Sequence, residues 1–393
     1  MKTNYANLDV LRSLAVLSVV AAHWRVEGVA FHLWAYDPGT NQLLHNLSYT
    51  GVMFFFVHTC LVLMLSMHRA PAIHRGSSFL VRRAFRIYPL CWATIFLVLT
   101  TGLTDQPDGT VHAMGWNGIV ANLLLVQNMA RSIPSVIGPL WSLPWEVQMY
   151  LVLPLFFFVL RRFAGRPVVF ALWLGAALLA IAATQPSMPR LLHAAIFPPM
   201  FIAGMVAFKL LEGQREQPSR AALPAWAWPL FVAGLFAVQG GIVGWHSFES
   251  SYAAGVNACI CLVLALAIPQ FGELKVGWIA HPAAQIAKYS YGIYLLHVPA
   301  LVFVFRYLPQ LPLALKLIAF ITLTALLSFV SFHLIENPLI RQGKRLAERV
   351  QAPDVSGLID PVPSSAVPAT YPVAGSGQRL CGRLSVFGQA GEK

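Results

Sequence analysis

The chain has 393 residues, of which 57% are hydrophobic and only 11% are charged, and its formal net charge is +12. Soluble domains carry about twice that share of charged residues, so the composition excludes an ordinary soluble protein and indicates one embedded in a membrane. The positive charge does not predict a nucleic-acid partner, because no nucleic-acid-binding module or basic groove is recognisable.

Apolar runs long enough to cross a bilayer, which takes about 20 residues, recur along the chain. We predict an all-α polytopic membrane protein with about ten transmembrane helices and with both termini in the cytoplasm. The predicted spans are 8–24, 47–67, 84–102, 146–160, 168–184, 191–211, 226–244, 252–270, 288–308 and 313–335. The segment at 118–128 is too short to cross and is expected to be re-entrant or interfacial.

The distribution of lysine and arginine predicts the orientation. With the N-terminus in the cytoplasm, most basic residues between spans lie on the inner side, including Arg161, Arg162 and Arg166. This is the positive-inside bias, and it also favours contact with anionic membrane lipid. We therefore expect a membrane domain over 1–345. The Pro-, Gly- and Ser-rich segment 346–393 is expected to be a disordered cytoplasmic tail.

The first span contains an arginine and a histidine, Arg12 and His23. Eleven residues make three helical turns plus about 20°, so both lie on one helix face, about 16 Å apart along the axis. Ionisable residues are costly inside a bilayer, and two on one face predict a wet cavity lined by protein. The alternative is that Arg12 extends to the headgroups and His23 merely ends the helix.

A second motif, Phe79–Pro89, precedes the third span on the cytoplasmic side. Arg83 and Arg86 are three residues apart and so are neighbours on one helix face. Their guanidinium groups match the geometry of phosphate and suit a phosphate-bearing ligand that arrives from the cytoplasm. Alternatively, they are ordinary topology signals.

The third motif, Gly138–Pro154, leads from the outer side into the fourth span and carries Glu146 with Tyr150 one turn later. A carboxylate here could orient a histidine and stabilise its protonated form. It could equally cap the N-terminus of the helix, where negative charge is favourable, and position alone favours the cap.

The ninth span begins with Lys288–His297. Tyr291 and Tyr294 are three residues apart, share a helix face and could line a polar cavity. Tyrosines near a membrane interface are more often simple anchors. Another intramembrane histidine, His58, is expected to be packed and hydrogen-bonded.

The five cysteines have no metal-ligand spacing, so we predict neither a metal site nor a disulfide framework.

Together and in this order, these motifs resemble acyltransferase family 3, the bacterial integral-membrane O-acyltransferases. The resemblance covers residues from about 5 to 340 and rests on five segments, which are Leu8–His23, Gly51–Thr59, Phe79–Pro89, Leu140–Pro154 and Ser290–His297. The most specific of these patterns is an arginine followed, after ten intervening residues, by a histidine, here Arg12 and His23.

The resemblance implies roles for individual residues. His23 corresponds to the family's essential histidine, Arg12 to its paired arginine and Glu146 to the glutamate of the WSL-containing motif. Arg83 and Arg86 match the motif thought to engage the acyl donor, usually acetyl-coenzyme A. The cavity and acceptor site would be formed by Asp9, Trp141, Ser142, Tyr150, Ser290, Tyr291, Tyr294 and His297.

The sequence departs from the family pattern at two places. Met53 stands where relatives often carry aspartate, and His58-Thr59-Cys60 replaces the usual Leu-Ser-Gly. Both departures bear on the size of the donor or the fit of the acceptor. We expect no counterpart of the soluble SGNH-type hydrolase domain that some family members carry.

The family resemblance implies an acyltransferase of the bacterial inner membrane with no bound cofactor and with acyl-CoA, usually acetyl-CoA, as co-substrate. The acceptor would be a hydroxyl of a glycan or another exported molecule. His23 would act as the base, or would itself carry the acyl group as an intermediate. The sequence does not indicate the acceptor or the oligomeric state.

The competing interpretations are a transporter or flippase for lipid-linked saccharides, and a polysaccharide polymerase. Against a transporter, the chain has no internal inverted repeat and no paired helices broken by Gly or Pro. Against a polymerase, the longest predicted outer stretch, 103–145, contains a single arginine, Arg131.

Overall fold

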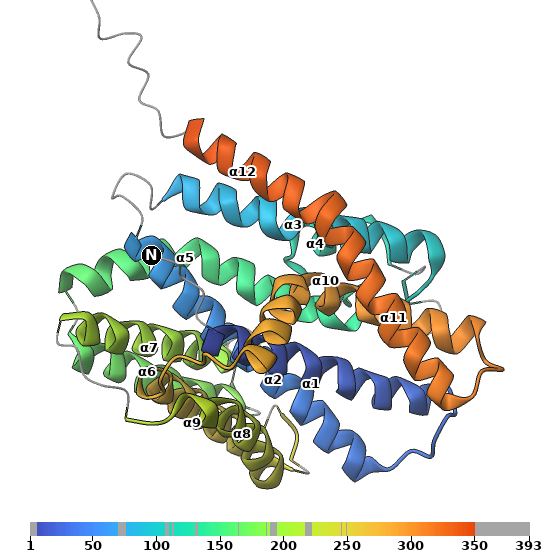
Figure 1. Ribbon diagram of the computed structural model, residues 1–393, viewed down its shortest axis with the longest axis horizontal. Helices are drawn as coiled ribbons and strands as arrows, with labels where there is room; N and C mark the ends of the chain where they lie inside the picture. Colours follow the sequence, from blue (N-terminus) through green and yellow to red (C-terminus); the bar gives the residue numbers. More distant parts are fainter. Residues whose placement is uncertain are drawn as a thin grey trace, which may run out of the picture. The chain divides into compact units, whose positions relative to one another are not determined.

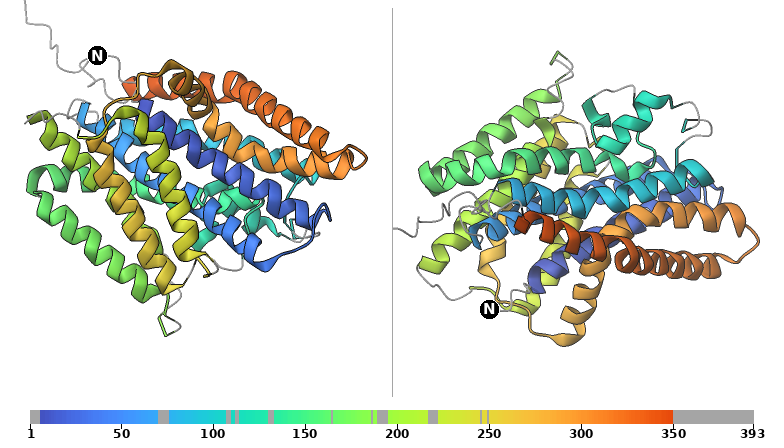
Figure 2. Two further views of the ribbon diagram at one scale, coloured as in Figure 1. Left: turned by 60° about the horizontal axis from the view of Figure 1, so that its bottom comes forward. Right: turned by 90° about the horizontal axis from the view of Figure 1, so that it is seen from above.

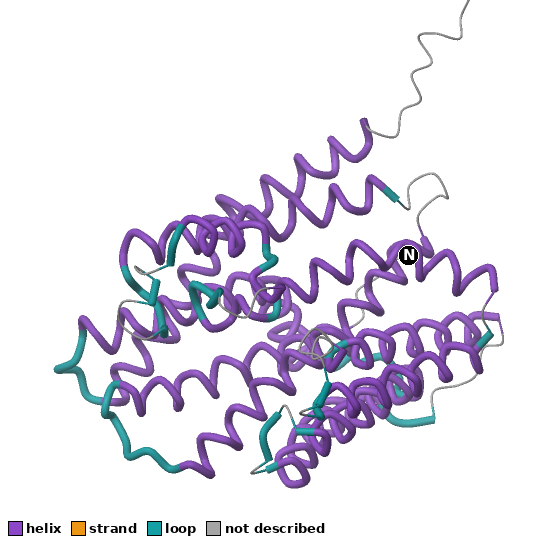
Figure 3. The backbone as a smooth tube through the Cα atoms, turned by 180° about the vertical axis from the view of Figure 1, so that it is seen from behind, coloured by secondary structure: helices purple, strands orange, loops and turns teal. Residues whose placement is uncertain are grey.

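Helices make up the secondary structure of the computed structural model shown in Figure 1. The structure describes residues 6–69, 76–106, 110–111, 114–129, 133–163, 165–185, 187–188, 195–216, 222–244, 246–248 and 250–349. Within these ranges Figure 3 shows helices and loops but no strand. The predicted all-α class is confirmed.

The helices follow the predicted spans in order, with α4 and α12 in addition. Their bounds are α1 Ala6–Ala30, α2 Pro38–Arg69, α3 Ser77–Thr101, α4 Trp116–Leu124, α5 Leu143–Phe163, α6 Arg166–Ala183, α7 Pro198–Glu216, α8 Trp228–Val243, α9 Ser251–Ala267, α10 Gly277–Tyr307, α11 Leu313–Ser331 and α12 Asn337–Arg349.

Among the described residues, nine helices are long and apolar enough to cross a membrane. The remaining predicted span, 191–211, corresponds to α7, which is not one of the nine. Its last turns carry the charges of Lys209, Glu212, Arg215 and Glu216. Charged side chains are poorly tolerated at the centre of a bilayer. The nine helices found among the described residues agree with the prediction of about ten spans, and the span at 191–211 stays a prediction.

Several helices extend beyond the apolar runs that predicted them. Helix α2 begins at Pro38 rather than near 47, and α10 begins at Gly277 rather than near 288. The backbone hydrogen bonds of a helix continue past the apolar segment when polar side chains reach water or other helices. Hydropathy therefore locates the centre of each span better than its ends.

The segment predicted to be too short to cross forms α4, a helix of nine residues. At 1.5 Å per residue it is about 13 Å long, less than half the thickness of the hydrocarbon core. Its re-entrant or interfacial position stays a prediction.

Helix α1 packs against both α2 and α10. Gly51 of α2 permits the first contact, because a Cβ atom at this position would lie 2.6 Å from the carbonyl oxygen of Ala15 in α1. Small residues of this kind let membrane helices approach closely. Helix α1 is thus held between the two elements that carry much of the candidate site.

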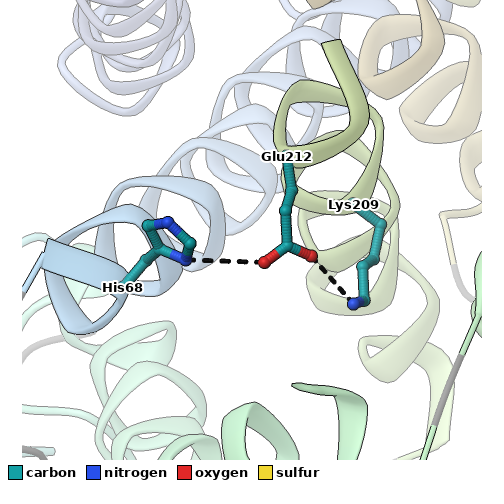
Figure 4. A network of polar contacts seen from close by, with 3 residues as sticks. All are labelled: His68, Lys209 and Glu212. Carbon is teal, nitrogen blue, oxygen red and sulfur yellow. Dashed lines mark hydrogen bonds and ion pairs between the residues drawn. The ribbon is translucent and has the colours of Figure 1, made fainter. Parts of the chain in front are cut away.

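Helix α2 also packs against α7. Near their ends Glu212 accepts a hydrogen bond from Lys209 at 2.8 Å and lies 3.5 Å from Nδ1 of His68 (Figure 4). This network belongs to the packing of the two helices, since none of its members lines the cavity described below.

Helix α11 continues through a π turn, Phe332–Glu336, into α12, so that one helix runs over Leu313–Arg349. Its last part, α12, lies along α3, as Figure 2 shows from two sides. Residues 346–349 of the predicted tail complete α12, and the rest of that tail lies outside the described residues.

Candidate functional site

A cavity of about 60 Å³ lies among α1, α2, α3, α5, α10 and the 3-10 turn Gly138–Trp141. Its lining consists of Arg12, Val52, Phe55, Phe56, Thr59, Arg86, Ile87, Ser142, Leu143, Glu146, Tyr150, Ser290, Tyr291 and Tyr294. The structure therefore brings together, around one space, predicted site residues from segments that are distant in the sequence.

Charged groups meet at this cavity. Arg12 interacts electrostatically with the charged side chains of Arg86, Glu146 and Glu336 and also with the hydroxyl group of Tyr150. The Nε atom of Arg12 is buried and has no hydrogen-bond partner. Arg12 thus faces the protein interior, and the alternative in which it extends to the headgroups does not describe this structure.

The carboxylate of Glu146 accepts a hydrogen bond from the hydroxyl group of Tyr150, one turn later in α5. Glu146 lies in the first turn of α5, as the cap interpretation required, yet its side chain lines the cavity. The tyrosine fixes the direction of the carboxylate, whose charge acts on Arg12 and Arg83.

His23 lies on α1 beside His297 of α10, with ring centroids 4.9 Å apart in an edge-to-face arrangement. Its Nδ1 atom is 2.9 Å from the carbonyl oxygen of Val19. A carbonyl can only accept, so this bond assigns the proton of neutral His23 to Nδ1 and leaves the Nε2 lone pair free. Nε2 can therefore accept a proton.

His297 has the same local geometry. Its Nδ1 atom is 3.0 Å from the carbonyl oxygen of Ile293, and its buried Nε2 atom has no partner. The ring of Tyr294, which lines the cavity, lies 6.3 Å from that of His297. His23 does not itself line the cavity, but its ring contacts that of His297, which lies beside the ring of Tyr294 on the cavity wall.

The tyrosines of α10 are tied into the interior. The hydroxyl group of Tyr294 lies 2.7 Å from that of Ser142 and donates to the carbonyl of Pro139 at 2.9 Å. The hydroxyl group of Tyr291 donates to the carbonyl of Ile87 at 2.6 Å. Both tyrosines therefore connect α10 with the elements opposite, which a simple interfacial anchor would not do.

Three further predicted residues lie beside the cavity rather than on its wall. Arg83 stacks over the ring of Phe79 at 5.7 Å, and its Nε atom is buried without a hydrogen-bond partner. The carboxyl group of Asp9 interacts electrostatically with the guanidinium group of Arg12.

Trp141, the third of these, packs on Tyr49 and Phe197 with centroid distances of 5.0 and 5.6 Å. His58 is packed as expected, but its Nδ1 atom has no hydrogen-bond partner.

Sequence reasoning missed Glu336, at the end of the π turn. Only 1% of its surface is exposed, and the charges that act on it are those of Arg86 and Arg12. No signal in the sequence indicated it, because a glutamate just after an apolar span is expected to face water.

In the described part of the chain, no three His, Cys, Asp or Glu side chains converge as metal ligands.

Comparison with known proteins adds to this geometry. Residues 5–333 match the family described as acyltransferase domain. The chain is similar to acyltransferase MdmB of Streptomyces mycarofaciens, with 27% identity over 318 residues, which cover 74% of this chain and 77% of the relative. Regulator of hypoxia-inducible factor 1 of Caenorhabditis elegans is 28% identical over 177 residues, which cover 40% of this chain and 35% of the relative.

Peptidoglycan O-acetyltransferase OatA of Listeria monocytogenes is 24% identical over 390 residues, which cover 86% of this chain. The chain spans only 56% of that relative's length. No solved structure matches the chain.

Proposed function

The chain belongs to the acyltransferase family that matches residues 5–333, and we propose from this that it moves an acetyl group from cytoplasmic acetyl-CoA to a hydroxyl of an exported glycan. That it is a membrane O-acyltransferase follows from the family and from the O-acetyltransferase relatives. The donor, the acceptor and the residue roles are the proposal. The observation that carries it is the cavity lined by Arg12, Arg86 and Glu146.

The donor would be held through its phosphates by Arg83 and Arg86. The buried, unpartnered Nε of Arg83 and the position of Arg86 on the cavity wall support this assignment. Arginine forks bind phosphate through two parallel hydrogen bonds. The thioester arm would then enter the cavity, whose volume of about 60 Å³ suits an acetyl group better than a long acyl chain.

His23 would act as the general base. As the acceptor oxygen attacks the thioester carbonyl, its proton passes to Nε2 of His23, and the proton on Nδ1 stays bonded to the carbonyl of Val19. The carbon–sulfur bond breaks and CoA leaves as the thiolate, which takes up a proton to give the free thiol. A positioned base contributes about 10²–10⁴-fold to such a reaction.

Arg12 and Glu146 would support the charges that develop during transfer. A guanidinium on the cavity wall stabilises negative charge on the tetrahedral oxygen, and a carboxylate nearby stabilises a protonated imidazole. The membrane domain would comprise 1–345, in the bacterial inner membrane and in contact with its lipid. The similarity to peptidoglycan O-acetyltransferase OatA supports a glycan acceptor.

The test is acetyl-CoA turnover by the purified protein in nanodiscs, measured as release of the CoA thiol in the presence of peptidoglycan fragments. We expect His23→Ala to lower turnover by at least about 10²-fold. The matched control is His281→Ala, because His281 is an exposed histidine of α10 with the same Nδ1-to-carbonyl contact, at 3.0 Å.

Arg83→Ala should raise the KM for acetyl-CoA, whereas Arg161→Ala, which removes an arginine stacked on Phe157 away from the cavity, should not. Wild-type turnover in a folded His23→Ala variant would contradict the proposal. So would the absence of any CoA binding by the wild-type protein.

A further inference from the structure

Glu336 is a buried carboxylate that the proposed reaction does not use. It is 1% exposed, and within the described chain neither of its carboxylate oxygens has a hydrogen-bond partner. Buried polar groups are nearly always paired, and a buried charge more consistently still. A buried carboxylate without hydrogen bonds therefore depends on the positive charges around it.

The backbone brings Glu336 to its place. Glu336 closes the π turn Phe332–Glu336 between α11 and α12, and single π turns inside α-helices occur frequently at functional sites. Helix α12 lies along α3, the helix that carries Arg83 and Arg86. Glu336, one residue past the predicted span 313–335, thus lies within the range of the charge of Arg86.

The charges that act on Glu336 are those of Arg86 and Arg12. Both arginines line the cavity, whereas Glu336 is not part of its lining. The Nε atom of Arg12 is itself without a partner. The charges of Glu336, Arg86 and Arg12 therefore interact, although Glu336 makes no hydrogen bond to either arginine. Such an arrangement is expected where a further charged group binds and leaves.

We propose that Glu336 is a positioning residue that acts through Arg86 and Arg12 as their counter-charge in the donor-free enzyme, and that a phosphate of the acyl donor takes over this part when it binds. The inference rests on the proposed function, because it requires a phosphate-bearing donor. It goes further in assigning a second anion that competes with the donor for the same guanidinium groups.

Glu146 does not serve the same purpose. Its carboxylate is held by the hydroxyl group of Tyr150 and remains on the cavity wall. Glu336 has no such bond, and its charge opposes an incoming phosphate. Glu336 therefore weakens donor binding and favours release of the product CoA by drawing the two arginines back.

The experiment measures the affinity for CoA and for S-acetylpantetheine, an acyl donor without phosphate, in nanodiscs. Glu336→Gln keeps the shape of the side chain and removes its charge, so CoA should bind about tenfold more tightly. Binding of S-acetylpantetheine should not change. Turnover at saturating acetyl-CoA should fall, because CoA leaves more slowly.

Glu212→Gln is the matched control. It removes a carboxylate from the network with Lys209 and His68, away from the cavity, and should leave the affinity for CoA unchanged. Glu336→Asp withdraws the carboxylate by one methylene without removing its charge, and should give an affinity between those of the wild type and Glu336→Gln. The Glu336→Asp variant still tests the inference if Glu336→Gln does not fold.

A folded Glu336→Gln variant with unchanged or weaker CoA binding would overturn the inference and leave the proposed function intact. Unchanged or weaker CoA binding by Glu336→Asp would overturn it in the same way. Failure of the wild-type protein to bind CoA would overturn the proposed donor, and this inference with it.

Discussion

The imidazole ring of His23 meets that of His297 edge to face, at 4.9 Å between centroids. Each Nδ1 is bonded to a carbonyl one turn earlier in its own helix, at Val19 and at Ile293. The two rings are thus fixed both by their helices and by each other. The orientation of the proposed base depends on α10 as much as on α1.

The first prediction distinguishes a packing role of the His297 ring from a chemical role of its Nε2 atom. His297→Phe keeps a flat ring against His23, so we expect acetyl transfer to remain within about fivefold of wild type. His297→Ala removes the ring, and a small displacement of a reacting group can cost about 10²-fold in rate. Both should leave the KM for acetyl-CoA unchanged in nanodisc assays. If the Phe variant is as inactive as the Ala variant, Nε2 takes part in the chemistry.

The second prediction concerns the hydroxyl group of Tyr294, which donates to the buried carbonyl of Pro139. Tyr294→Phe leaves that carbonyl without this donor and should lower the free energy of unfolding by about 1–3 kcal/mol. Ser142→Ala is the comparison, because the bond from Tyr294 to Pro139 survives in it, and a smaller loss is expected. Chemical denaturation in detergent measures both; equal losses would show that the carbonyl bond is not the important one.

The third prediction tests the contact of α1 with α2. A Cβ atom at Gly51 would lie 2.6 Å from the carbonyl oxygen of Ala15, so Gly51→Ala must push the helices apart and should cost about 1–3 kcal/mol. Gly175→Ala in α6 is the control, since a Cβ atom there meets no other atom within 4 Å. Alanine should stabilise that helix slightly. The melting temperatures of the two variants should move in opposite directions.

The fourth prediction concerns Glu273, in the connection before α10. Partial loss of hydration raises the pKa of its carboxyl above the ordinary value of 4.5, although the backbone N–H of Asn7 donates to it at 3.1 Å. A raised pKa means that the folded state holds the proton more tightly than the unfolded state. The contribution of Glu273 to stability is therefore full below the unfolded pKa and declines as the pH rises through the folded value.

Glu273→Gln should accordingly melt at a higher temperature than wild type at neutral pH and at the same temperature below the unfolded pKa. Its amide oxygen can still accept the bond from Asn7. A difference in melting temperature that does not vary with pH would contradict this assignment.

The sequence identified candidate residues of the site better than it identified the helices that surround the cavity. Arg12, Arg86 and Glu146 could be found because charges are rare and costly in apolar segments, so each one demands an explanation. Their meeting at one cavity depends on which helices pack together, and hydropathy carries no information about that. Hydropathy also did not indicate that α10 begins at Gly277, before the apolar run from which its span was predicted.

His23 shows a different limit. Its position on the face of Arg12 was predictable from the helical period, but its partner was not. The contact with His297 arises because α1 packs against α10, although 274 positions separate the two histidines in the numbering of the chain. Glu336 was missed because local sequence places it after the last span, and only the π turn directs it inward.

That π turn also sets the rotational register of everything that follows it. A π turn holds one residue more than an α-helix would, and each residue corresponds to about 100° around the axis. Gly343, whose missing side chain makes room for Phe85 of α3, lies in the helix that follows this turn, so its direction depends on the extra residue. Deletion of a single residue, such as His333, would restore a regular helix and rotate α12 about its own axis. The smallest possible change in chain length would thus disengage the two helices and carry Glu336 away from the arginines at the same time.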